Sequence, residues 1–186
     1  MRVIETPLPG VVVIEPDVYM DHRGSFAETY QQERYLRAGI GGTFVQDNCV
    51  HSRHGVLRGL HYQLRKAQGK LVYPATGEIF DVAVDIRKGS PTFGRWFGTT
   101  LSWDKRSQIY VPGGFAHGYF VLSETADVVY KCTEFYDPDD EYGIAWDDPD
   151  IGIDWPDRSP ILSEKDGRNP FLAQIPEDSL PVYEGQ

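Results

Sequence analysis

Short apolar segments follow one another closely along most of this chain, and they constrain the fold more than any other feature of the sequence. Each ends near Gly, Pro, Asp or Ser, and they cover residues 11–16, 25–30, 44–50, 55–63, 69–75, 78–87, 96–103, 107–112, 117–122 and 127–136. Segments of this length between turn signals are typical of β-strands. Many strands at this spacing predict an all-β sandwich or barrel. Only residues 31–40 have a good helical pattern in the first half, and glycines end it.

The segment EIFDVAVDIR (78–87) places its side chains alternately on two faces, as a strand requires. The face from Phe80 to Ile86 is wholly apolar, which predicts a core position. The other face carries Asp81 and Asp85, and we expect these carboxylates in solvent or in a polar cavity.

The length and composition indicate one globular domain over residues 1–186. With 186 residues, 40% of them hydrophobic and 25% charged, the chain is long enough to bury a core. From about residue 137 the sequence becomes rich in Asp, Pro, Gly and Trp, and its aromatic residues and isoleucines predict an ordered loop that needs burial. We expect the tail of about residues 174–186 to be peripheral.

The net charge and the cysteine content exclude several classes of function. A formal charge of −10 argues against nucleic-acid binding, so any anionic ligand needs a local group of cations. Cys49 and Cys132 are too few for a disulfide framework, which favours a reducing compartment. The N-terminus lacks the apolar run of a signal peptide, and no segment has membrane-spanning length. We therefore expect a cytoplasmic protein with no membrane partner.

The histidines raise the question of a metal site. His117 ends the segment PGGFAH, which resembles the second metal motif of the cupin superfamily. The first motif of that superfamily needs two histidines separated by one residue, but Gln63 stands where the partner of His61 would be. His51 and His54 are three residues apart, so a regular strand puts them on opposite faces. Since a tight site needs three or four convergent ligands, we predict no metal.

Proton transfer fits the segment GVLRGLHYQ (55–63) better. Its apolar residues predict a core strand, and a core strand that also carries a cation and an imidazole is typical of a pocket wall. Histidine is the usual proton-transfer group near neutral pH, so His61 is the expected base, with a structural core histidine as the alternative. A catalytic imidazole needs an orienting carboxylate, and spacing alone leaves Asp81, Asp85 and Asp166 open.

Tyr130 and Lys70 interrupt apolar strands, and the phenol of Tyr130 is a candidate for the conjugate acid. A core tyrosine and a surface lysine are the alternatives for these two residues. Arg23, Arg58, Lys70 and Lys165 lie away from the charge runs, and a few inward cations are what a phosphorylated substrate needs. The chain has no P-loop, no GxGxxG and no Gly-x-Ser-x-Gly, which argues against nucleotide hydrolysis, dinucleotide binding and serine hydrolase chemistry.

The spacing of Arg58 and His61 carries a structural prediction. They are three residues apart, so a regular strand would put them on opposite faces. If both line a pocket, the strand must bulge or twist. Gly59 is the expected place for this distortion, because glycine within a strand often marks a bulge.

Nine segments, taken in order over nearly the whole chain, resemble one family. They read DHRGSFAETY, FVQDN, GVLRGLHYQ, AQGKLV, GEIFDVAVDIRKGSPTFG, VPGGFAHGYFVLS, VYKCTEFYDP, EYGIAWDDPDIGIDWP and LSEKD. The family is dTDP-4-dehydrorhamnose 3,5-epimerase, a cupin-type jelly roll. The resemblance therefore implies an all-β jelly-roll sandwich with a few short helices.

The same resemblance implies an activity. The substrate is dTDP-4-dehydro-6-deoxy-D-glucose, which is inverted at C3 and C5 to dTDP-4-dehydro-L-rhamnose in dTDP-L-rhamnose biosynthesis. Both protons are α to the C4 ketone, so their removal gives an enolate. By resemblance His61 is the base and Asp166 orients it. Tyr130 returns a proton from the opposite face of the ring, and Lys70 stabilises the enolate oxygen. The family requires no metal and no organic cofactor.

Substrate-binding residues and partners are also carried over from the family. The binding residues are Arg23, Glu28, Gln46, Asp47, Asn48, Arg58, His117, Tyr136, Glu141 and Lys165. Arg58 and His117 would lie at the sugar and the diphosphate. Tyr136 would stack on thymine, with Glu141 and Lys165 at the nucleotide end. The implied partners are the dTDP-linked 4-keto-6-deoxyhexose and a second copy of the chain, because the family forms homodimers by strand exchange from the N-terminal segment.

Some residues depart from the family pattern. Ser25, Tyr73 and Pro74 differ from the residues common in relatives, and the segment LRKAQ (64–68) is unusual in its charge. We expect them to bear on which sugar is accepted or on how many centres are inverted. Two alternatives stay open at this point. One is a single-centre epimerase (C3 or C5) of a related deoxysugar pathway, and the other is a non-catalytic cupin that binds sugar nucleotides.

Overall fold

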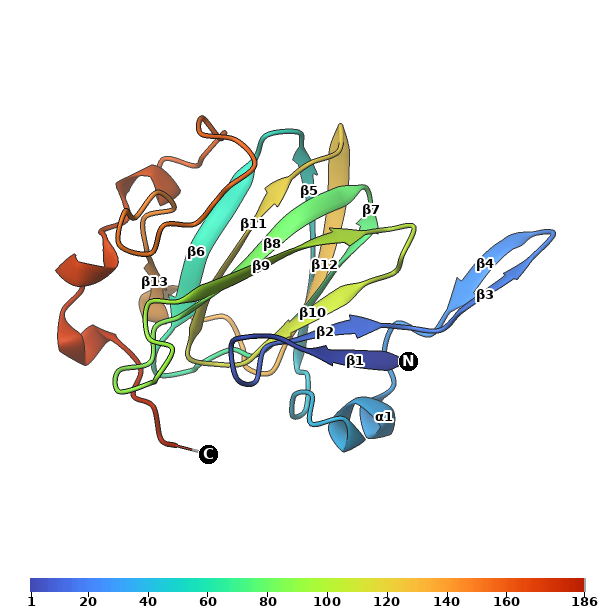
Figure 1. The fold of residues 1–186 in the computed structure, drawn as a ribbon, viewed down its shortest axis with the longest axis horizontal. Coiled ribbons are helices and arrows are strands. Elements are labelled where there is room, and N and C mark those ends of the chain that lie inside the picture. Colours follow the sequence, from blue (N-terminus) through green and yellow to red (C-terminus); the bar gives the residue numbers. More distant parts are fainter. Residues whose placement is uncertain (186) are drawn as a thin grey trace.

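The computed structural model describes residues 1–185, and most of its strands form two packed sheets (Figure 1). The six-stranded sheet has the order β1 (Arg2–Glu5), β2 (Val12–Glu15), β10 (Gln108–Val111), β7 (Lys70–Thr76), β12 (Thr125–Cys132) and β5 (Gln46–Arg53). The five-stranded sheet has the order β13 (Glu141–Gly143), β6 (Leu57–Gln63), β11 (Phe115–Val121), β8 (Glu78–Asp85) and β9 (Trp96–Ser102). The strand pairs are antiparallel.

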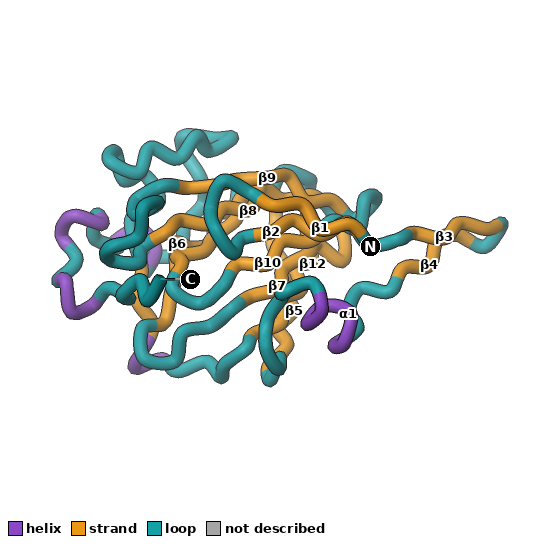
Figure 2. The backbone as a smooth tube through the Cα atoms, turned by 60° about the horizontal axis from the view of Figure 1, so that its bottom comes forward, coloured by secondary structure: helices purple, strands orange, loops and turns teal. Residues whose placement is uncertain are grey.

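Helical structure is confined to short segments at the periphery of the strands (Figure 2). The predicted helix is α1 (Gln32–Arg37), which ends before the glycines that begin at Gly39. The other helical segments are single 3-10 turns, η1 (Pro138–Asp140), η2 (Asp166–Arg168), η3 (Leu172–Gln174) and η4 (Glu177–Ser179). This arrangement confirms the predicted all-β sandwich with a few short helices.

The chain passes repeatedly between the two sheets. β5, β7, β10 and β12 belong to one sheet, while β6, β8, β9 and β11 belong to the other. This connectivity is that of a jelly roll. The inner core accordingly combines buried residues of both sheets, among them Val72, Ile109 and Val128 from one and Ile79, Ala83 and Tyr119 from the other. Segments that follow one another in sequence therefore face each other across the interior.

A second core lies on the outer face of the five-stranded sheet, where the C-terminal part of the chain covers it. Leu60 and Phe120 come from the sheet, while Ile151, Trp155 and Leu180 come from the covering segment. The sequence from residue 137 onward is thus ordered and packed, as its aromatic residues predict.

The expected peripheral tail lies on this covered face. Leu180 is buried in the outer core, and the carbonyl of Ser179 accepts a hydrogen bond from Tyr62 at 2.9 Å. Gln186, the last residue of the predicted tail, lies outside the described residues. Within residues 1–185, no helix has the length and apolar character needed to cross a bilayer.

β8 is buried on both of its faces, which excludes solvent, one of the two expected environments of Asp81 and Asp85. Its even-numbered apolar face packs in the outer core, as predicted. The opposite face points inward, where Ile79 and Ala83 join the inner core and Asp81 and Asp85 are fully buried. Neither carboxylate is in solvent, because β8 lies between β11 and β9 with the other sheet on one side and the C-terminal segment on the other.

β6 is distorted at Gly59, as predicted. Leu57 and Leu60 both pack in the outer core although they are three residues apart. Arg58 and His61, also three residues apart, both line the cavity between the sheets. The local bulge therefore gives the strand two apolar anchors on one side and two functional side chains on the other.

The bulge depends on a close contact with β11. The pairing register between the two strands shifts between His117 and Tyr119, opposite Gly59. Gly59 has a φ of 118°, and a Cβ at this position would lie 2.6 Å from the Cα of Gly118 and 2.7 Å from the carbonyl oxygen of His117. Only glycine satisfies both the dihedral angle and the spacing.

β3 (Val18–Asp21) and β4 (Gly24–Ala27) form a hairpin that projects from the two sheets (Figure 1). A turn at His22 and Arg23 connects its strands. Its large side chains are largely uncovered, since Tyr19 is 64% exposed, Met20 73% and Phe26 68%. Grouped apolar side chains on a projecting hairpin are typical of a surface that contacts another chain.

We expect Gly59→Ala to lower the free energy of unfolding by at least about 2 kcal/mol, because it combines backbone strain with overpacking against β11. Urea unfolding followed by circular dichroism measures this change. Gly42→Ala is the matched control, since a Cβ at Gly42 meets no atom within 4 Å. Equal stability of the two variants would contradict the proposed role of the contact.

Candidate active site

A cavity of about 810 Å³ opens between the two sheets. Its walls come from β5, β7 and β12 of the six-stranded sheet, β6 and β11 of the five-stranded sheet, and the segment 161–166. The volume lies in the range of about 300–1,000 Å³ typical of small-molecule sites. Most of the expected site residues converge on this cavity.

His61 and Asp166 form a hydrogen-bonded pair on one wall. His61 Nε2 lies 2.6 Å from Asp166 Oδ1, so the imidazole proton is assigned to Nε2 and Nδ1 is left with a lone pair. Nδ1 lies 4.0 Å from Glu141 Oε1. Two carboxylates therefore stabilise the imidazolium that forms when Nδ1 takes a proton. Of the three carboxylates that spacing left open, Asp166 is the one placed beside His61.

Asp166 is buried and fixed by several parts of the chain. Its backbone amide donates to Ser163 Oγ at 3.0 Å, and the amide of Gly59 donates to Asp166 Oδ2 at 3.5 Å. Burial alone would raise the pKa of Asp166, but the hydrogen bonds from His61 and Gly59 outweigh it and hold the pKa below its usual value. The carboxylate is therefore ionised at neutral pH.

A second histidine–aspartate pair lies beside the first. His117 on β11 is the cross-strand neighbour of His61, and its Nε2 lies 2.9 Å from Asp81 Oδ1 on β8. Asp81 therefore orients His117, not His61. Asp85 belongs to a separate structural cluster, in which Arg87 donates to it at 2.7 Å.

Tyr130 on β12 and Lys70 on β7 line the cavity from the opposite sheet. Burial raises the pKa of Tyr130, which keeps the phenol protonated at neutral pH. Burial lowers the pKa of Lys70, with nearby acidic groups opposing the shift. The candidate base and the candidate acid thus face one cavity from opposite sides.

Glu141 organises a polar cluster at the cavity wall. Its Oε2 accepts hydrogen bonds from Tyr136 Oη at 2.9 Å and from Lys165 Nζ. Burial alone would raise the pKa of Glu141, but these two donors lower it. Gln46 Oε1 accepts the backbone amide of Tyr136 at 2.8 Å, and Gln46 Nε2 donates to Asn48 at 3.1 Å.

Arg58 supplies a cation to the same cavity. Its Nε donates to Ser52 Oγ at 2.9 Å, which fixes the guanidinium while leaving its terminal nitrogens for a ligand. The expected catalytic residues all line the cavity, together with Gln46, Asn48, Arg58, His117, Tyr136, Glu141 and Lys165.

The position of Asp47 departs from the expectation that the whole QDN segment binds substrate. Side chains alternate along β5, so Gln46 and Asn48 point inward and Asp47 points outward. Asp47 is exposed and forms an ion pair with Lys131 at 2.8 Å on the outer face of the sheet. Within this chain it does not reach the cavity.

Arg23 and Glu28 also lie away from the cavity of their own chain. Arg23 is at the end of the projecting hairpin, where it pairs with Asp21 at 2.6 Å. Glu28 follows the hairpin and pairs with Arg34 of α1 at 2.8 Å. The structure therefore does not bring these two expected binding residues to the site from within one chain.

Sequence reasoning missed several cavity residues, notably Tyr119, Gln63 and Gln68. Tyr119 is buried, and burial raises its pKa to about 12. Alternation along β11 from His117 would have found Tyr119. Gln63 attracted attention only as the position of an absent histidine. No group of three or more His, Cys, Asp or Glu side chains in the described part of the chain is arranged to hold a metal ion.

These groups can perform acid–base chemistry on carbon. An oriented imidazole can take a proton, a protonated phenol on the facing wall can return one, and an ammonium group can stabilise the negative charge between the two steps. A jelly-roll sandwich with this set of groups in its central cavity belongs to the class of enzymes that remove a proton from carbon and return one.

Comparisons with known proteins narrow the class to a family. The family model described as dTDP-4-dehydrorhamnose 3,5-epimerase matches residues 5–174. A relative of that name from Pseudomonas aeruginosa is 52% identical over 175 residues, which cover 93% of this chain and 97% of the relative. One from Neisseria gonorrhoeae is 50% identical over 97% of this chain, which spans 55% of that relative's length. This chain belongs to the dTDP-4-dehydrorhamnose 3,5-epimerase family.

The fold agrees with this membership. A crystal structure of dTDP-6-deoxy-D-glucose-3,5-epimerase from Legionella pneumophila, in complex with dTDP-4-keto-L-rhamnose, superposes with a TM-score of 0.96 at 49% sequence identity. The match covers 99% of each chain.

We expect Asp166→Asn to lower turnover by about 100-fold or more, because the imidazolium of His61 loses its charged partner.

The Asp166→Asn variant should also be less stable than the unmodified protein at pH 7. Since the folded-state pKa of Asp166 is lowered, its contribution to stability is present above the unfolded-state pKa and is lost as the pH falls through the folded-state value. Unfolding measured between pH 7 and pH 3 should therefore show the gap to the unmodified protein closing on acidification. Glu164→Gln, an exposed neighbour, is the control, and a gap that widens at low pH would contradict the assignment.

Proposed function

We propose that this protein epimerises C3 and C5 of dTDP-4-dehydro-6-deoxy-D-glucose and gives dTDP-4-dehydro-L-rhamnose for dTDP-L-rhamnose biosynthesis. The observation that carries the proposal is the placement of His61 and Tyr130 on facing sheets around one cavity. A centre is inverted when a proton leaves one face of a carbon and another proton arrives at the other face. Membership of the family supports this choice of substrate.

In the proposed mechanism His61 Nδ1 takes the proton from the carbon next to the C4 ketone. The electron pair of the broken C–H bond moves into the ring, and the negative charge collects on O4 as an enolate. Asp166 stabilises the imidazolium, and the ammonium of Lys70 stabilises O4. Tyr130 then donates its phenolic proton to the same carbon from the opposite side, and the ketone re-forms. Exchange with water restores both groups before the second centre reacts.

The remaining cavity residues are proposed to hold the nucleotide. Arg58 and His117 contact the sugar and the diphosphate. Tyr136 stacks on the thymine, with Glu141 and Lys165 beside it. The chain has a net charge of −10, so these local cations are what makes a dianionic diphosphate bind at all. Gln46 and Asn48 supply neutral donors and acceptors on the wall of β5.

The working form is proposed to be a homodimer. The β3–β4 hairpin projects with exposed apolar side chains, and Arg23 at its end is 79% exposed. If the hairpin packs against a second copy, these side chains are covered and Arg23 is carried toward a cavity other than that of its own chain. This arrangement accounts for a binding residue that lies far from the cavity of its own chain.

The reaction is tested by incubating the protein with dTDP-4-dehydro-6-deoxy-D-glucose in D₂O and following the ring protons by NMR. We expect deuterium at both C3 and C5, and no exchange with His61→Ala. Tyr130→Phe should reduce completed inversion more than exchange, because it removes the proton donor and leaves the base. Label at one centre only would indicate a single-centre epimerase, and no label would leave a non-catalytic binding protein.

The dimer is tested by mixing two inactive variants, Arg23→Ala and His61→Ala. A mixed dimer contains one cavity in which His61 and the partner's Arg23 are both intact, so the mixture should regain up to about a quarter of the unmodified activity. Each variant alone should stay inactive at the same concentration. Activity that does not recover after the subunits have demonstrably exchanged would contradict Arg23 acting across the interface.

A further inference from the structure

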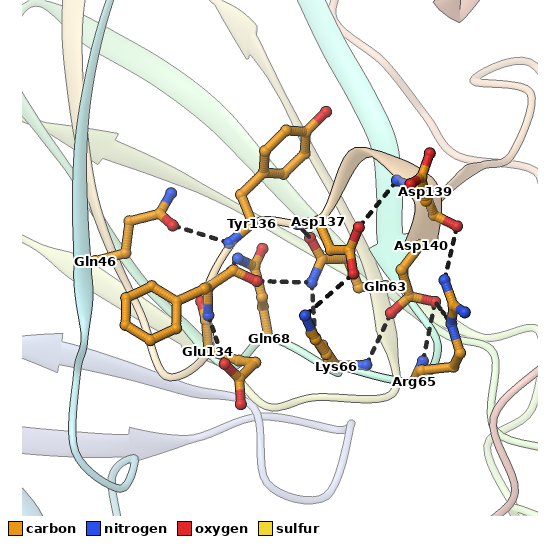
Figure 3. Close-up of polar contacts among 11 residues, drawn as sticks. Gln46, Gln63, Arg65, Lys66, Gln68, Glu134, Tyr136, Asp137, Asp139 and Asp140 are labelled. Carbon is orange, nitrogen blue, oxygen red and sulfur yellow. Dashed lines mark hydrogen bonds and ion pairs between the residues drawn. The ribbon is translucent and has the colours of Figure 1, made fainter.

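The charged segment 64–68, which the catalytic proposal leaves without a role, is tied to the loop 133–140 beside the cavity (Figure 3). Residues 64–68 follow β6, and residues 133–140 connect β12 with β13. The loop 133–140 carries Tyr136, whose side chain lines the cavity. We call the bonds that Gln63 and residues 64–68 form with the loop 133–140, together with the bond from Gln63 to Lys66, the loop clamp.

Gln63 at the end of β6 forms the inner part of the loop clamp. Its Nε2 donates to the carbonyl oxygens of Lys66 at 2.8 Å and Phe135 at 3.2 Å, and its Oε1 accepts the backbone amide of Asp137 at 2.9 Å. Gln63 is 4% exposed, although it borders the cavity. Both amide protons of the side chain are therefore used within the protein, and its carbonyl oxygen accepts one hydrogen bond there.

Asp140 forms the outer part of the loop clamp. Its side chain is fully buried, and its Oδ2 accepts the backbone amide of Lys66 at 2.8 Å. Its Oδ1 accepts the backbone amide of Arg65 at 3.1 Å and Arg65 Nε at 3.2 Å. A buried carboxylate with three donors is strongly fixed, since removing any partner leaves part of its charge unsatisfied.

Two further contacts complete the loop clamp. Lys66 Nζ pairs with Asp137 at 3.1 Å, and Gln68 Nε2 donates to the carbonyl of Glu134 at 2.9 Å. The unusual charge of residues 64–68 is thereby matched by the acidic residues of the facing loop.

The bonds of the loop clamp converge on the backbone around Tyr136. The residues before and after it, Phe135 and Asp137, are both bonded to Gln63, and its own amide donates to Gln46. The phenol is held by Glu141, while the side chain remains about half exposed at the cavity. The ring is thus fixed in position but has a free surface on which a flat group can stack.

We propose that Gln63 and Asp140 are positioning residues that act through Tyr136 on the nucleobase end of the ligand. The inference rests on the proposed function, since it takes the flat group to be the base of a nucleoside diphosphate. An aromatic ring that is already fixed loses little conformational freedom on binding, so the loop clamp raises affinity for the base. The side chains of Gln63 and Asp140 form no bond with the proposed proton-transfer groups, so we expect the rate of the bound substrate to be kept.

The test compares Gln63→Leu and Asp140→Asn with the unmodified protein. Calorimetry with dTDP should show a dissociation constant about tenfold higher, in keeping with the loss of most of one stacking contact. The constant for inorganic pyrophosphate should change less than about twofold, and in steady-state assays KM should rise while kcat is kept. Arg37→Met is the control, because its pair with Glu33 lies on α1.

A double-mutant cycle with Tyr136→Ala decides whether Gln63 acts through the ring. On that background Gln63→Leu should have little further effect on dTDP binding. Equal losses for dTDP and pyrophosphate, additive losses in the cycle, or a fall in kcat alone would overturn the inference. Lys66→Met leaves the buried bonds in place and should raise the dissociation constant of dTDP about twofold. This variant extends the test if a variant of a buried residue does not fold. An unchanged dissociation constant in both Lys66→Met and Asp140→Asn would also overturn the inference. Failure of the unmodified protein to bind dTDP would instead refute the proposed function.

Discussion

The close approach of Gly59 on β6 to Gly118 on β11 is the contact on which the site depends. A side chain at either position would collide with backbone atoms of the facing strand, within 2.6 Å and 2.7 Å respectively. The approach permits the bulge, and the bulge lets Leu57 and Leu60 face outward while Arg58 and His61 face inward. A catalytic wall and a hydrophobic anchor are thus obtained from one seven-residue strand.

The proposed catalytic pair of His61 and Asp166 is linked to the outer core in a second way. Asp166, which orients His61, lies 105 residues further along the chain. It is held there because the C-terminal segment packs Trp155 and Leu180 against the outer face of the five-stranded sheet. Hydrophobic packing on one side of the sheet therefore fixes the position of a charge used on the other side. A substitution that disturbs this packing would displace Asp166 and so affect the proposed proton transfer, although no proposed catalytic residue is replaced.

The local sequence pattern predicted most of the strands and the helix. It could not predict which strands pair with one another over long sequence distances. The strands and α1 follow from short apolar segments and turn residues, and the bulge follows from the spacing of Arg58 and His61. Which carboxylate serves which histidine depends on the order of β6, β11 and β8, which periodicity does not encode. The roles of the site residues came from family resemblance. The bonds of Gln63 could not be predicted because two of its partners are backbone groups of a distant loop. Arg23 lies away from the cavity of its own chain, so its expected role depends on the proposed second copy.

The passage of the chain from one sheet to the other has a consequence for how the protein folds. His61, Lys70, Tyr130 and Asp166 come from four elements. β6 and β7 are consecutive, but the base and its carboxylate lie 105 residues apart. The loop-closure entropy of such non-local pairings is lost before their contacts contribute, and this slows folding. The cavity is therefore complete only when the C-terminal segment that carries Asp166 is packed on the five-stranded sheet.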